Sequence, residues 1–210
     1  AYLEDYAALI LGLLALYQSD HNPRWYQAAE ELVQAMVEHY RDPQGGFFDT
    51  ADDHEALLLR PKDVQDNAIP SGNALAALAL LQLAAYSGEH SWRKLAEEAL
   101  GSMQNFMVRY PTGFAQWLNA LDFALGPVQE VALVGKAGAP DLQALQTALW
   151  STYRPRLVAA CAPDGQATET PPLLANRPVQ NEQATAYVCQ GFVCQRPVNT
   201  AAELLTQLSQ

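Results

Sequence analysis

The sequence contains little positive charge, few cysteines and no long hydrophobic run. Of its 210 residues, 12 are Lys or Arg and 23 are Asp or Glu, so the formal net charge is −11. Such an acidic surface repels phosphate, and we therefore expect no nucleic-acid binding and no docking on anionic membranes. The longest apolar run, residues 7–17, is about half of the roughly 20 residues that a membrane span needs. Three cysteines are too few for a disulfide scaffold.

Half of the residues are apolar, which is enough for a sizeable core. Apolar residues recur at helical spacing through most of the first two thirds of the chain. The face formed by Leu3, Tyr6, Leu9, Ile10, Leu13, Leu14 and Tyr17 is one example. Asn22, Ser71 and Ser91 are the expected N-caps of the helices that follow them. We predict helices over residues 3–17, 24–40, 72–86, 92–109 and 114–125, with 72–86 buried on all sides.

The first two helix pairs form an internal repeat. Tyr17 corresponds to Tyr86, and Trp25 corresponds to Trp92. In each pair the first helix is the more apolar, and the second has a charged flank. Paired helices of this kind build toroids and solenoids. We therefore predict a mainly α fold, an incomplete (α/α)6-type toroid with a small C-terminal α/β appendage.

Too few hairpins are present to close a ring. The open edge is expected to be covered by a missing N-terminal part of the same protein or by a second copy of this chain. The chain starts without Met and inside a helical pattern, which suggests a piece of a longer protein.

The pattern changes after Gly126. Residues 128–134 and 157–161 are expected to be strands, with a helix between them that Asp141 caps and that ends near residue 153, giving a βαβ unit. Residues 162–181 are expected to be loop, 185–194 a hairpin, and 200–208 a helix capped by Thr200 or Asn199. The predicted domains are residues 1–126, with a long loop at 42–70, and residues 127–210.

The long loop is the first candidate for chemistry. It combines carboxylates with the aromatic residues Phe47 and Phe48, which suits a sugar-like ligand because rings stack on Phe and hydroxyls bond to carboxylates. The alternative is that the charged residues are solvated and the Phe side chains fix the loop to the body. The loop carboxylates and basic residues are Asp49, Asp52, Asp53, Glu55, Asp63, Asp66, His54, Arg60 and Lys62.

The end of this loop gives a sharper pattern. Lys62, Asp66, Ser71 and Asn73 are concentrated where the helix at 72–86 begins, and the backbone amides there could bind an anion or a polar ligand. The alternative is ordinary capping by Ser71, with Asn73 bonded to the loop backbone.

The predicted helix over residues 3–17 also begins with polar residues. Asp5 and Tyr6 lie there, and if the two apolar helices are parallel neighbours, these residues share one rim with Ser71 and Asn73. That rim would be the mouth of a central cavity. The alternative is that the acidic residues only complement the helix dipole.

The cysteines leave several alternatives open. Cys189 and Cys194 could form a disulfide across a tight hairpin, a partial metal site, or two reduced and half-buried thiols. We favour the reduced pair, because free cysteine is commonly buried. A zinc site needs four ligands, and the histidines are far away in sequence, so no metal or other cofactor is expected. Cys161 is interpreted as a core residue of a strand.

Five segments together resemble one protein family. It is the family of bacterial thioredoxin-domain-containing proteins related to mammalian spermatogenesis-associated protein 20. The segments are residues 3–7 (LEDYA), 45–50 (GGFFDT), 59–63 (LRPKD), 66–73 (DNAIPSGN) and 186–189 (AYVC). The resemblance covers nearly the whole chain. One departure is Asn67, where members usually have Gly; Asn is the non-Gly residue best able to keep a left-handed turn.

The resemblance implies an architecture. Members carry a thioredoxin-like domain followed by an (α/α)6 barrel, which is similar to that of N-acylglucosamine 2-epimerases and six-hairpin glycosidases. The chain would then be the C-terminal part of such a protein, in the bacterial cytoplasm. The family has no settled reaction.

Two functions follow as hypotheses. The first is a carbohydrate-type binding site, or an epimerase- or isomerase-like site, at the rim. Its acid and base would be chosen among His54, Asp66 and Asp5, and Arg60 and Lys62 would orient the substrate. The second is a non-enzymatic scaffold that presents clients to the thioredoxin-like domain, with Cys189 and Cys194 as possible redox partners.

Overall fold

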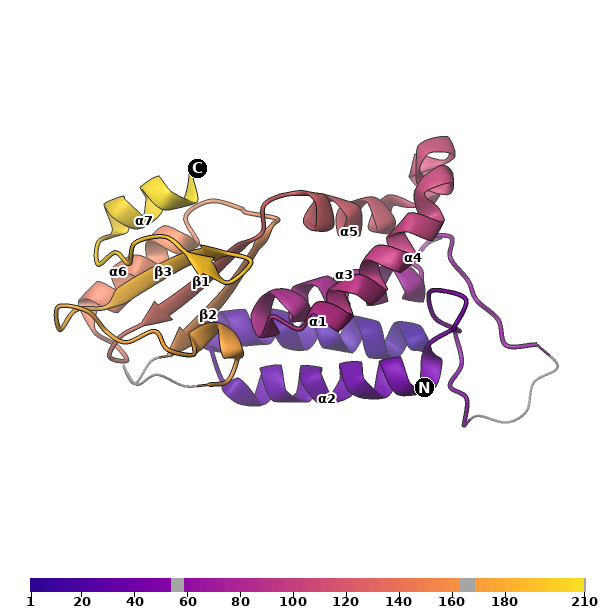
Figure 1. Cartoon of the computed structure of the whole chain (residues 1–210), viewed down its shortest axis with the longest axis horizontal. Helices are drawn as coiled ribbons and strands as arrows, with labels where there is room; N and C mark the ends of the chain where they lie inside the picture. The colour runs from indigo at the N-terminus through magenta and orange to yellow at the C-terminus, as the bar shows by residue number, and fades with distance from the viewer. Residues whose placement is uncertain (54–58, 163–168, 210) are drawn as a thin grey trace. The chain divides into compact units, whose positions relative to one another are not determined.

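A computed structural model describes residues 1–53, 59–162 and 169–209 (Figure 1). The predicted catalytic residue His54 lies outside these ranges. Within the described residues, no helix has the length and apolar character needed to cross a membrane. The chain divides into two compact units. The first comprises residues 1–16, 24–84 and 89–126, and the second comprises 17–23, 85–88 and 127–210.

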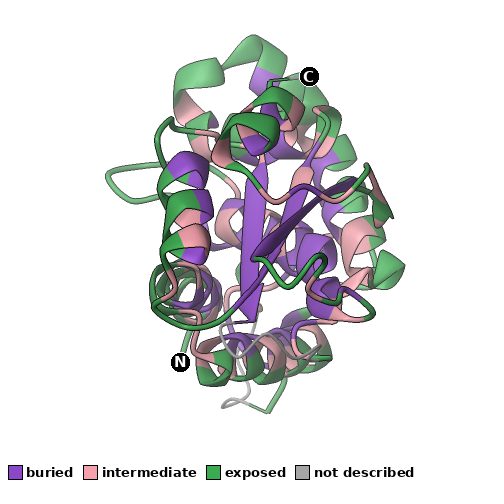
Figure 2. Ribbon diagram, turned by 90° about the vertical axis from the view of Figure 1, so that its left-hand side faces the viewer, coloured by how far each residue is buried: buried purple, intermediate pink, exposed green. Residues whose placement is uncertain are grey.

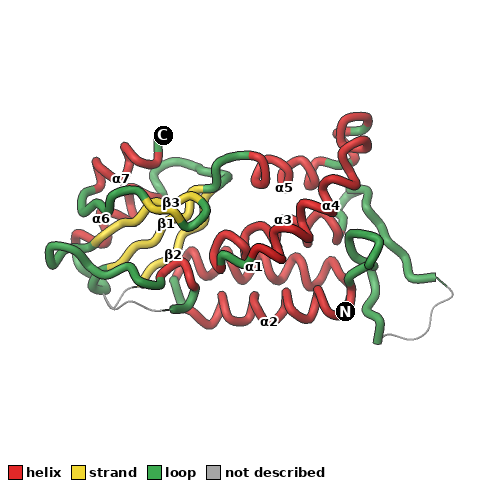
Figure 3. The backbone as a smooth tube through the Cα atoms, in the orientation of Figure 1, coloured by secondary structure: helices red, strands yellow, loops and turns green. Residues whose placement is uncertain are grey.

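The first unit is helical. It is built from α1 (Leu3–Asp20), α2 (Pro23–Tyr40), α3 (Gly72–Ser87), α4 (His90–Arg109), a short 3-10 helix at Pro111–Gly113 and α5 (Ala115–Leu125). Helices α1 and α2 lie side by side as an antiparallel hairpin (Figures 1 and 3). The predicted helices over these ranges are confirmed to within a few residues.

The helices of this unit differ in how much of their surface is buried. Helix α2 buries one stripe at helical spacing, which includes Tyr26, Val33 and Met36. Helix α3 is buried along nearly its whole length, as its all-round apolar sequence predicts. The predicted inward face of α1 is wrong at one position, because Leu9 is 54% exposed.

Two predicted caps are confirmed and two are wrong. Ser71 Oγ accepts a hydrogen bond from Ala74 N (3.2 Å) at the start of α3. Thr200 accepts one from Glu203 N at the start of the last helix. Helix α4 is capped by Glu89, whose carboxylate accepts from Ser91 N, so Ser91 is a donor and not the cap. Asp141 lies inside the first turn of its helix, and its Oδ2 accepts from Ala184 N (2.7 Å).

The second unit contains a four-stranded sheet in the order β2-β1-β3-β4. Its elements are β1 (Gln129–Val134), α6 (Pro140–Leu149), β2 (Leu157–Ala162), a 3-10 helix at Pro172–Leu174, β3 (Thr185–Gln190), β4 (Val193–Cys194) and α7 (Ala201–Leu208). Strands β1 and β2 are parallel and joined through α6, so the predicted βαβ unit is confirmed. Strands β3 and β4 form the predicted antiparallel hairpin.

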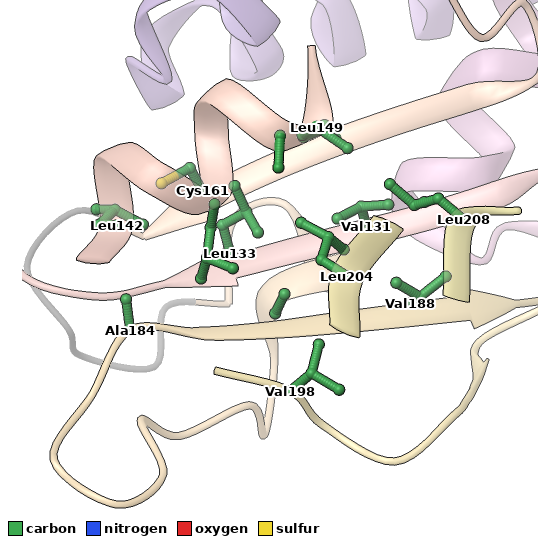
Figure 4. Close-up of a cluster of buried hydrophobic side chains, with 14 of the residues drawn as sticks. Val131, Leu133, Leu142, Leu149, Cys161, Ala184, Val188, Val198, Leu204 and Leu208 are labelled. Atoms are coloured by element: carbon green, nitrogen blue, oxygen red, sulfur yellow. The ribbon is translucent and has the colours of Figure 1, made fainter. Parts of the chain in front are cut away.

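The core of this unit lies between one face of the sheet and helices α6 and α7. Val131 and Leu133 of β1 belong to a buried cluster that also holds Leu142 of α6 and Leu204 of α7 (Figure 4). Strands β1, β2 and β3 are buried over most of their length (Figure 2). Such continuous burial explains why their sequences are apolar without a clear alternation.

The cysteine prediction is corrected by the structure. Cys189 and Cys194 form a disulfide across the β3–β4 hairpin, so the preferred pair of reduced thiols is wrong. Their pairing is a consequence of register, because the two residues are direct cross-strand partners. Cys161 is a free, buried residue of β2, as predicted.

Candidate ligand-binding site at the start of α1 and α3

Helices α1 and α3 begin next to each other. A Cβ atom on Gly72 would lie 3.0 Å from Glu4 N and 3.2 Å from Leu3 Cγ, so the absence of a side chain permits this approach. Asp5 Oδ2 accepts a hydrogen bond from Tyr2 N (2.8 Å). This is the capping-box contact, in which an acidic residue of the first turn binds the backbone amide of the residue before the helix. The structure thus gives Asp5 a capping contact at the start of α1.

The long loop is attached to α3 through Asn73, which is 1% exposed. Its Oδ1 accepts from Phe47 N (2.8 Å), and its Nδ2 donates to Phe47 O (2.9 Å) and Asp63 O (3.2 Å). Gly46 lies against the same side chain, where a Cβ atom would be 3.0 Å from Asn73 Oδ1. Gly46 also has φ +70, which favours glycine. The buried Phe47 and Asn73 therefore hold the loop on the helix.

The two loop cations bind backbone groups of the loop and its flanks. Arg60 donates to His39 O (3.0 Å) and to Thr50 O, and its guanidinium lies 4.2 Å from the centre of the Phe48 ring. Lys62 Nζ donates to Asp42 Oδ2 (3.1 Å) and to Gly45 O. These contacts fold the loop back on itself.

Asp66 connects three segments. Its Oδ1 accepts from Ser71 N (2.9 Å), and its Oδ2 accepts from Gln116 N (2.8 Å). The Asp66 amide donates to Gly113 O (2.9 Å). Gln116 lies in the first turn of α5, whose own N-cap residue gives no side-chain hydrogen bond. Asp66 therefore supplies from a distant segment the acceptor that this helix start needs.

A cavity of about 360 Å³ opens at the joint start of α1 and α3. Carboxylates supply its charge, and amide, hydroxyl and apolar groups supply the rest of the wall. Its lining residues are Tyr2, Glu4, Asp49, Pro61, Asp63, Gln65, Asn67, Ile69, Pro70, Ser71 and Gly72.

The predicted site residues divide into two groups. Ser71 lines the cavity. The others described by the structure lie outside its lining and make the contacts given above, except Tyr6, whose ring packs 5.2 Å from that of Tyr40. These others are Asp5, Tyr6, Phe47, Phe48, Arg60, Lys62, Asp66 and Asn73.

Asp49 has the most unusual environment in the cavity wall. Its backbone is held by Leu3 N to Asp49 O (3.0 Å) and by Asp49 N to Pro61 O (2.9 Å). Burial raises the pKa of its carboxyl, and the nearby charges of Asp63 and Glu4 raise it further, against one hydrogen bond from Asp63 N to Oδ2 (2.9 Å). Sequence reasoning did not select Asp49, because nothing in the sequence distinguishes it from the other loop carboxylates.

A second polar cluster lies at the end of α2. His39 Nδ1 is 2.9 Å from Asp52 Oδ1, and Asp53 is close enough to share a cation with them. The hydrogen bond to Asp52 raises the pKa of His39, although partial desolvation opposes it. The two carboxylates are exposed, and the charges of Glu38 and Asp53 also raise the pKa of His39.

No protein-family model matches the sequence. The chain is similar to spermatogenesis-associated protein 20 of Homo sapiens, with 32% identity over 97% of this chain and 26% of the human protein. The protein of the same name from Rattus norvegicus is 30% identical over 100% of this chain and 27% of its own length. Uncharacterized protein B0495.5 of Caenorhabditis elegans is 24% identical over 97% of this chain.

These similarities support the resemblance to the spermatogenesis-associated protein 20 family over the segment compared. The chain spans about a quarter of the length of these curated relatives. Their names state no reaction and no ligand, so they establish no function for this chain.

Proposed function

We propose that the cavity at the start of α1 and α3 binds a neutral, hydroxyl-rich small molecule of carbohydrate type. The observation that carries this proposal is the composition of the cavity wall. Glu4, Asp49 and Asp63 supply hydrogen-bond acceptors, while Gln65 and Asn67 supply donors as well. Tyr2 and Ile69 add apolar surface, which suits the less polar faces of a sugar ring.

The charge of the wall favours a neutral ligand over a phosphorylated one. The described lining residues include three acidic residues and no basic one. Arg60 and Lys62, the cations closest in sequence, are engaged with loop carbonyls and with Asp42. A sugar phosphate would therefore meet uncompensated negative charge.

Asp49 and Asp63 are the groups we propose for proton transfer. The raised pKa of Asp49 brings its carboxyl closer to the range where it can both donate and accept a proton. Asp63 lines the same cavity. Epimerase- or isomerase-like chemistry requires two such groups, and we propose this pair in place of Asp66 and Asp5 because Asp49 and Asp63 line the cavity and the other two do not.

We also infer that the two hairpins α1–α2 and α3–α4 are successive members of a larger α/α toroid. The repeat in the sequence supports this, as does the burial of α3 on nearly all sides. In that arrangement α1 and α3 are inner helices, and the cavity lies at the end of the inner layer where both begin.

The proposal is tested by ligand binding to matched variants. The chain is titrated with neutral monosaccharides and oligosaccharides and with their phosphates, using thermal shift and NMR chemical shifts. Asp49→Asn keeps an oxygen that can accept from Asp63 N. Glu31→Gln removes one charge from an exposed position on α2 and serves as the control.

We expect a neutral sugar to bind the wild type and Glu31→Gln with equal affinity. The same sugar should bind Asp49→Asn at least tenfold more weakly. Sugar phosphates should bind the wild type more weakly than the parent sugars do. Equal binding to both variants, or no response of Asn67 and Gln65 signals to any sugar, would contradict the proposal. Proton exchange at a sugar carbon, followed by NMR in D₂O, then separates turnover from binding.

A further inference from the structure

The β3–β4 hairpin places a disulfide beside a second cavity. Cys189 is 1% exposed, whereas Cys194 is half-buried and lines a cavity of about 470 Å³. The cavity wall is mostly apolar and contains one charged side chain among the described residues, Arg177. This site lies in the second unit and is independent of the carbohydrate proposal.

Arg177 is buried against the two sulfur atoms. It is 7% exposed, and its Nη2 lies 3.3 Å from Cys194 Sγ and 3.6 Å from Cys189 Sγ. Nη1 donates to Ala175 O (3.1 Å), while Nε is buried with no hydrogen-bond partner among the described residues. A disulfide sulfur is a weak acceptor, so a buried guanidinium gains little from the oxidised pair. It would gain much more from a thiolate.

Other charged and titratable groups around the site are Glu130 and Tyr187. Glu130 is 4% exposed; its Oε1 accepts from Gly191 N (3.1 Å) and its Oε2 from Phe192 N (2.7 Å), which holds the hairpin turn. Tyr187 donates its hydroxyl proton to Pro178 O (2.6 Å), and burial raises its pKa, so it is neutral near pH 7. Glu130 opposes a thiolate electrostatically, but its oxygens are already bound to the turn.

We propose that Cys189–Cys194 is a reversible thiol–disulfide site, which a dithiol reduces through the cavity beside Arg177. A thiolate of the dithiol attacks Cys194 Sγ, the sulfur that lines the cavity. The Cys189–Cys194 bond breaks, and its electron pair leaves on Cys189 Sγ as a thiolate bound to Arg177. The turn held by Glu130 keeps the two cysteines close while the bond is open.

The second thiol of the dithiol completes the exchange. After losing its proton to water, it attacks the dithiol's own sulfur in the mixed disulfide, and Cys194 leaves as a thiolate. The dithiol becomes a disulfide and gives up two electrons and two protons. The protein gains the two electrons; one of its thiolates takes up a proton from water, the other stays charged beside Arg177, and the second proton remains in solution. Arg177 favours this direction because it stabilises the charged product more than the starting disulfide.

The test compares Arg177→Met with Arg196→Met. Arg196 is near Cys194 in sequence, but it is exposed and pairs with Glu203 (3.5 Å), so its loss makes the same change in charge without touching the sulfurs. Each protein is equilibrated with mixtures of reduced and oxidised dithiothreitol and alkylated. Peptide mass spectrometry then reports Cys189 and Cys194 separately from the buried Cys161.

We expect the equilibrium constant for reduction by dithiothreitol to fall at least tenfold in Arg177→Met and to stay unchanged in Arg196→Met. Arg177→Lys, which keeps the charge, should lie between the wild type and Arg177→Met. Equal constants for the two Met variants, or a wild-type pair that is reduced only after unfolding, would overturn the proposal.

A second measurement needs only the wild type and covers the case in which Arg177→Met does not fold. The reduced protein is alkylated with iodoacetamide over a range of pH. Thiolate stabilisation by Arg177 predicts that the first of the two thiols to react, Cys189 or Cys194, has a midpoint below the value of about 8.5 for free cysteine. A midpoint at or above that value means that Glu130 and burial outweigh Arg177, and it would refute the proposed role.

Discussion

Asp66 links the starts of α3 and α5 through two buried or half-buried amides. Asp66→Ala removes the acceptor for Ser71 N and for Gln116 N, so both helix starts lose a hydrogen bond at once. We expect a loss of about 2–4 kcal/mol in the free energy of unfolding, measured by urea denaturation. Asp63→Ala is the control, because among the described residues its carboxylate accepts only from the exposed Gln65 N. Similar losses in the two variants would show that Asp66 does not connect the helices.

The His39–Asp52 pair predicts a pH dependence of stability. The pKa of His39 is raised and that of Asp52 is lowered, in each case chiefly by the hydrogen bond between them. The stabilisation that comes from the raised pKa of His39 is fully present below the ordinary pKa of histidine, about 6.5. It is lost as the pH rises through the raised pKa of His39. The stabilisation that comes from the lowered pKa of Asp52 is lost as the pH falls through that pKa. The pair therefore stabilises the fold between these limits.

We expect the difference in free energy of unfolding between the wild type and Asp52→Asn to be larger at pH 5.5 than at pH 8.5. NMR titration should give a His39 midpoint above 6.5 in the wild type and a lower one in Asp52→Asn. Glu38→Gln, a neighbouring charge with a smaller effect on His39, is the control. An unchanged His39 midpoint in Asp52→Asn would contradict the assignment.

Asp66 and Asp49 show which features of the site the sequence alone could not predict. The density of polar residues before α3 was visible, but the partner of Asp66 at Gln116 is far along the chain and leaves no local signal. Asp49 differs from the other loop carboxylates only through the charges and burial that the fold brings to it. The carboxylates of one loop are equivalent until tertiary contacts separate them.

At the scale of the helices, the sequence predicts the N-cap correctly where no other side chain takes that role. Ser71 and Thr200 cap as predicted. Asn199, the alternative to Thr200, instead donates its amide protons to Gln180 O and Ala184 O. Ser91 is displaced by Glu89, a longer side chain two residues earlier, and Asp141 is turned toward Ala184 N in another segment. The hairpin register, which the sequence left open, decides that Cys189 and Cys194 face each other.

The attachment of the long loop to α3 can be tested at Asn73. Asn73→Ala leaves Phe47 N without its acceptor and two carbonyls without a donor, all close to the buried Phe47 side chain. We expect a loss of about 3 kcal/mol in urea denaturation, since buried unpaired groups are costly. The control is Asn119→Ala on α5, because Asn119 is exposed and its amide donates to the Gln116 side chain (3.2 Å).

Loss of the Asn73 side chain should also weaken the binding of any ligand in the cavity at the start of α1 and α3, because this side chain holds the backbone of Asp63. Hydrogen exchange should rise in residues 46–48 and 62–64 and remain unchanged in α2. Protection that is equal in Asn73→Ala and Asn119→Ala would show that Phe47 alone holds the loop.

At the scale of the whole molecule, α1 leaves an apolar stripe uncovered in the chain as described. Leu9 is 54% exposed and Leu16 is 47% exposed, and Ala8 and Gly12 are also exposed on this helix. The spacing of this stripe matches that of a helix–helix contact. A net charge of −11 opposes the close approach of two copies, and salt would reduce that opposition.

We therefore expect the chain to self-associate through the exposed stripe of α1, more strongly at high salt because repulsion between acidic surfaces is screened. Leu9→Gln combined with Leu16→Gln should shift sedimentation toward the monomer at every protein concentration. Leu125→Gln is the control, since this leucine is 78% exposed on α5, away from the stripe. A wild type that stays monomeric at high salt would exclude a second copy as the partner of α1. Association that the α1 variant and the control weaken equally would instead place the contact elsewhere, because a specific helix face must respond more than a scattered exposed leucine.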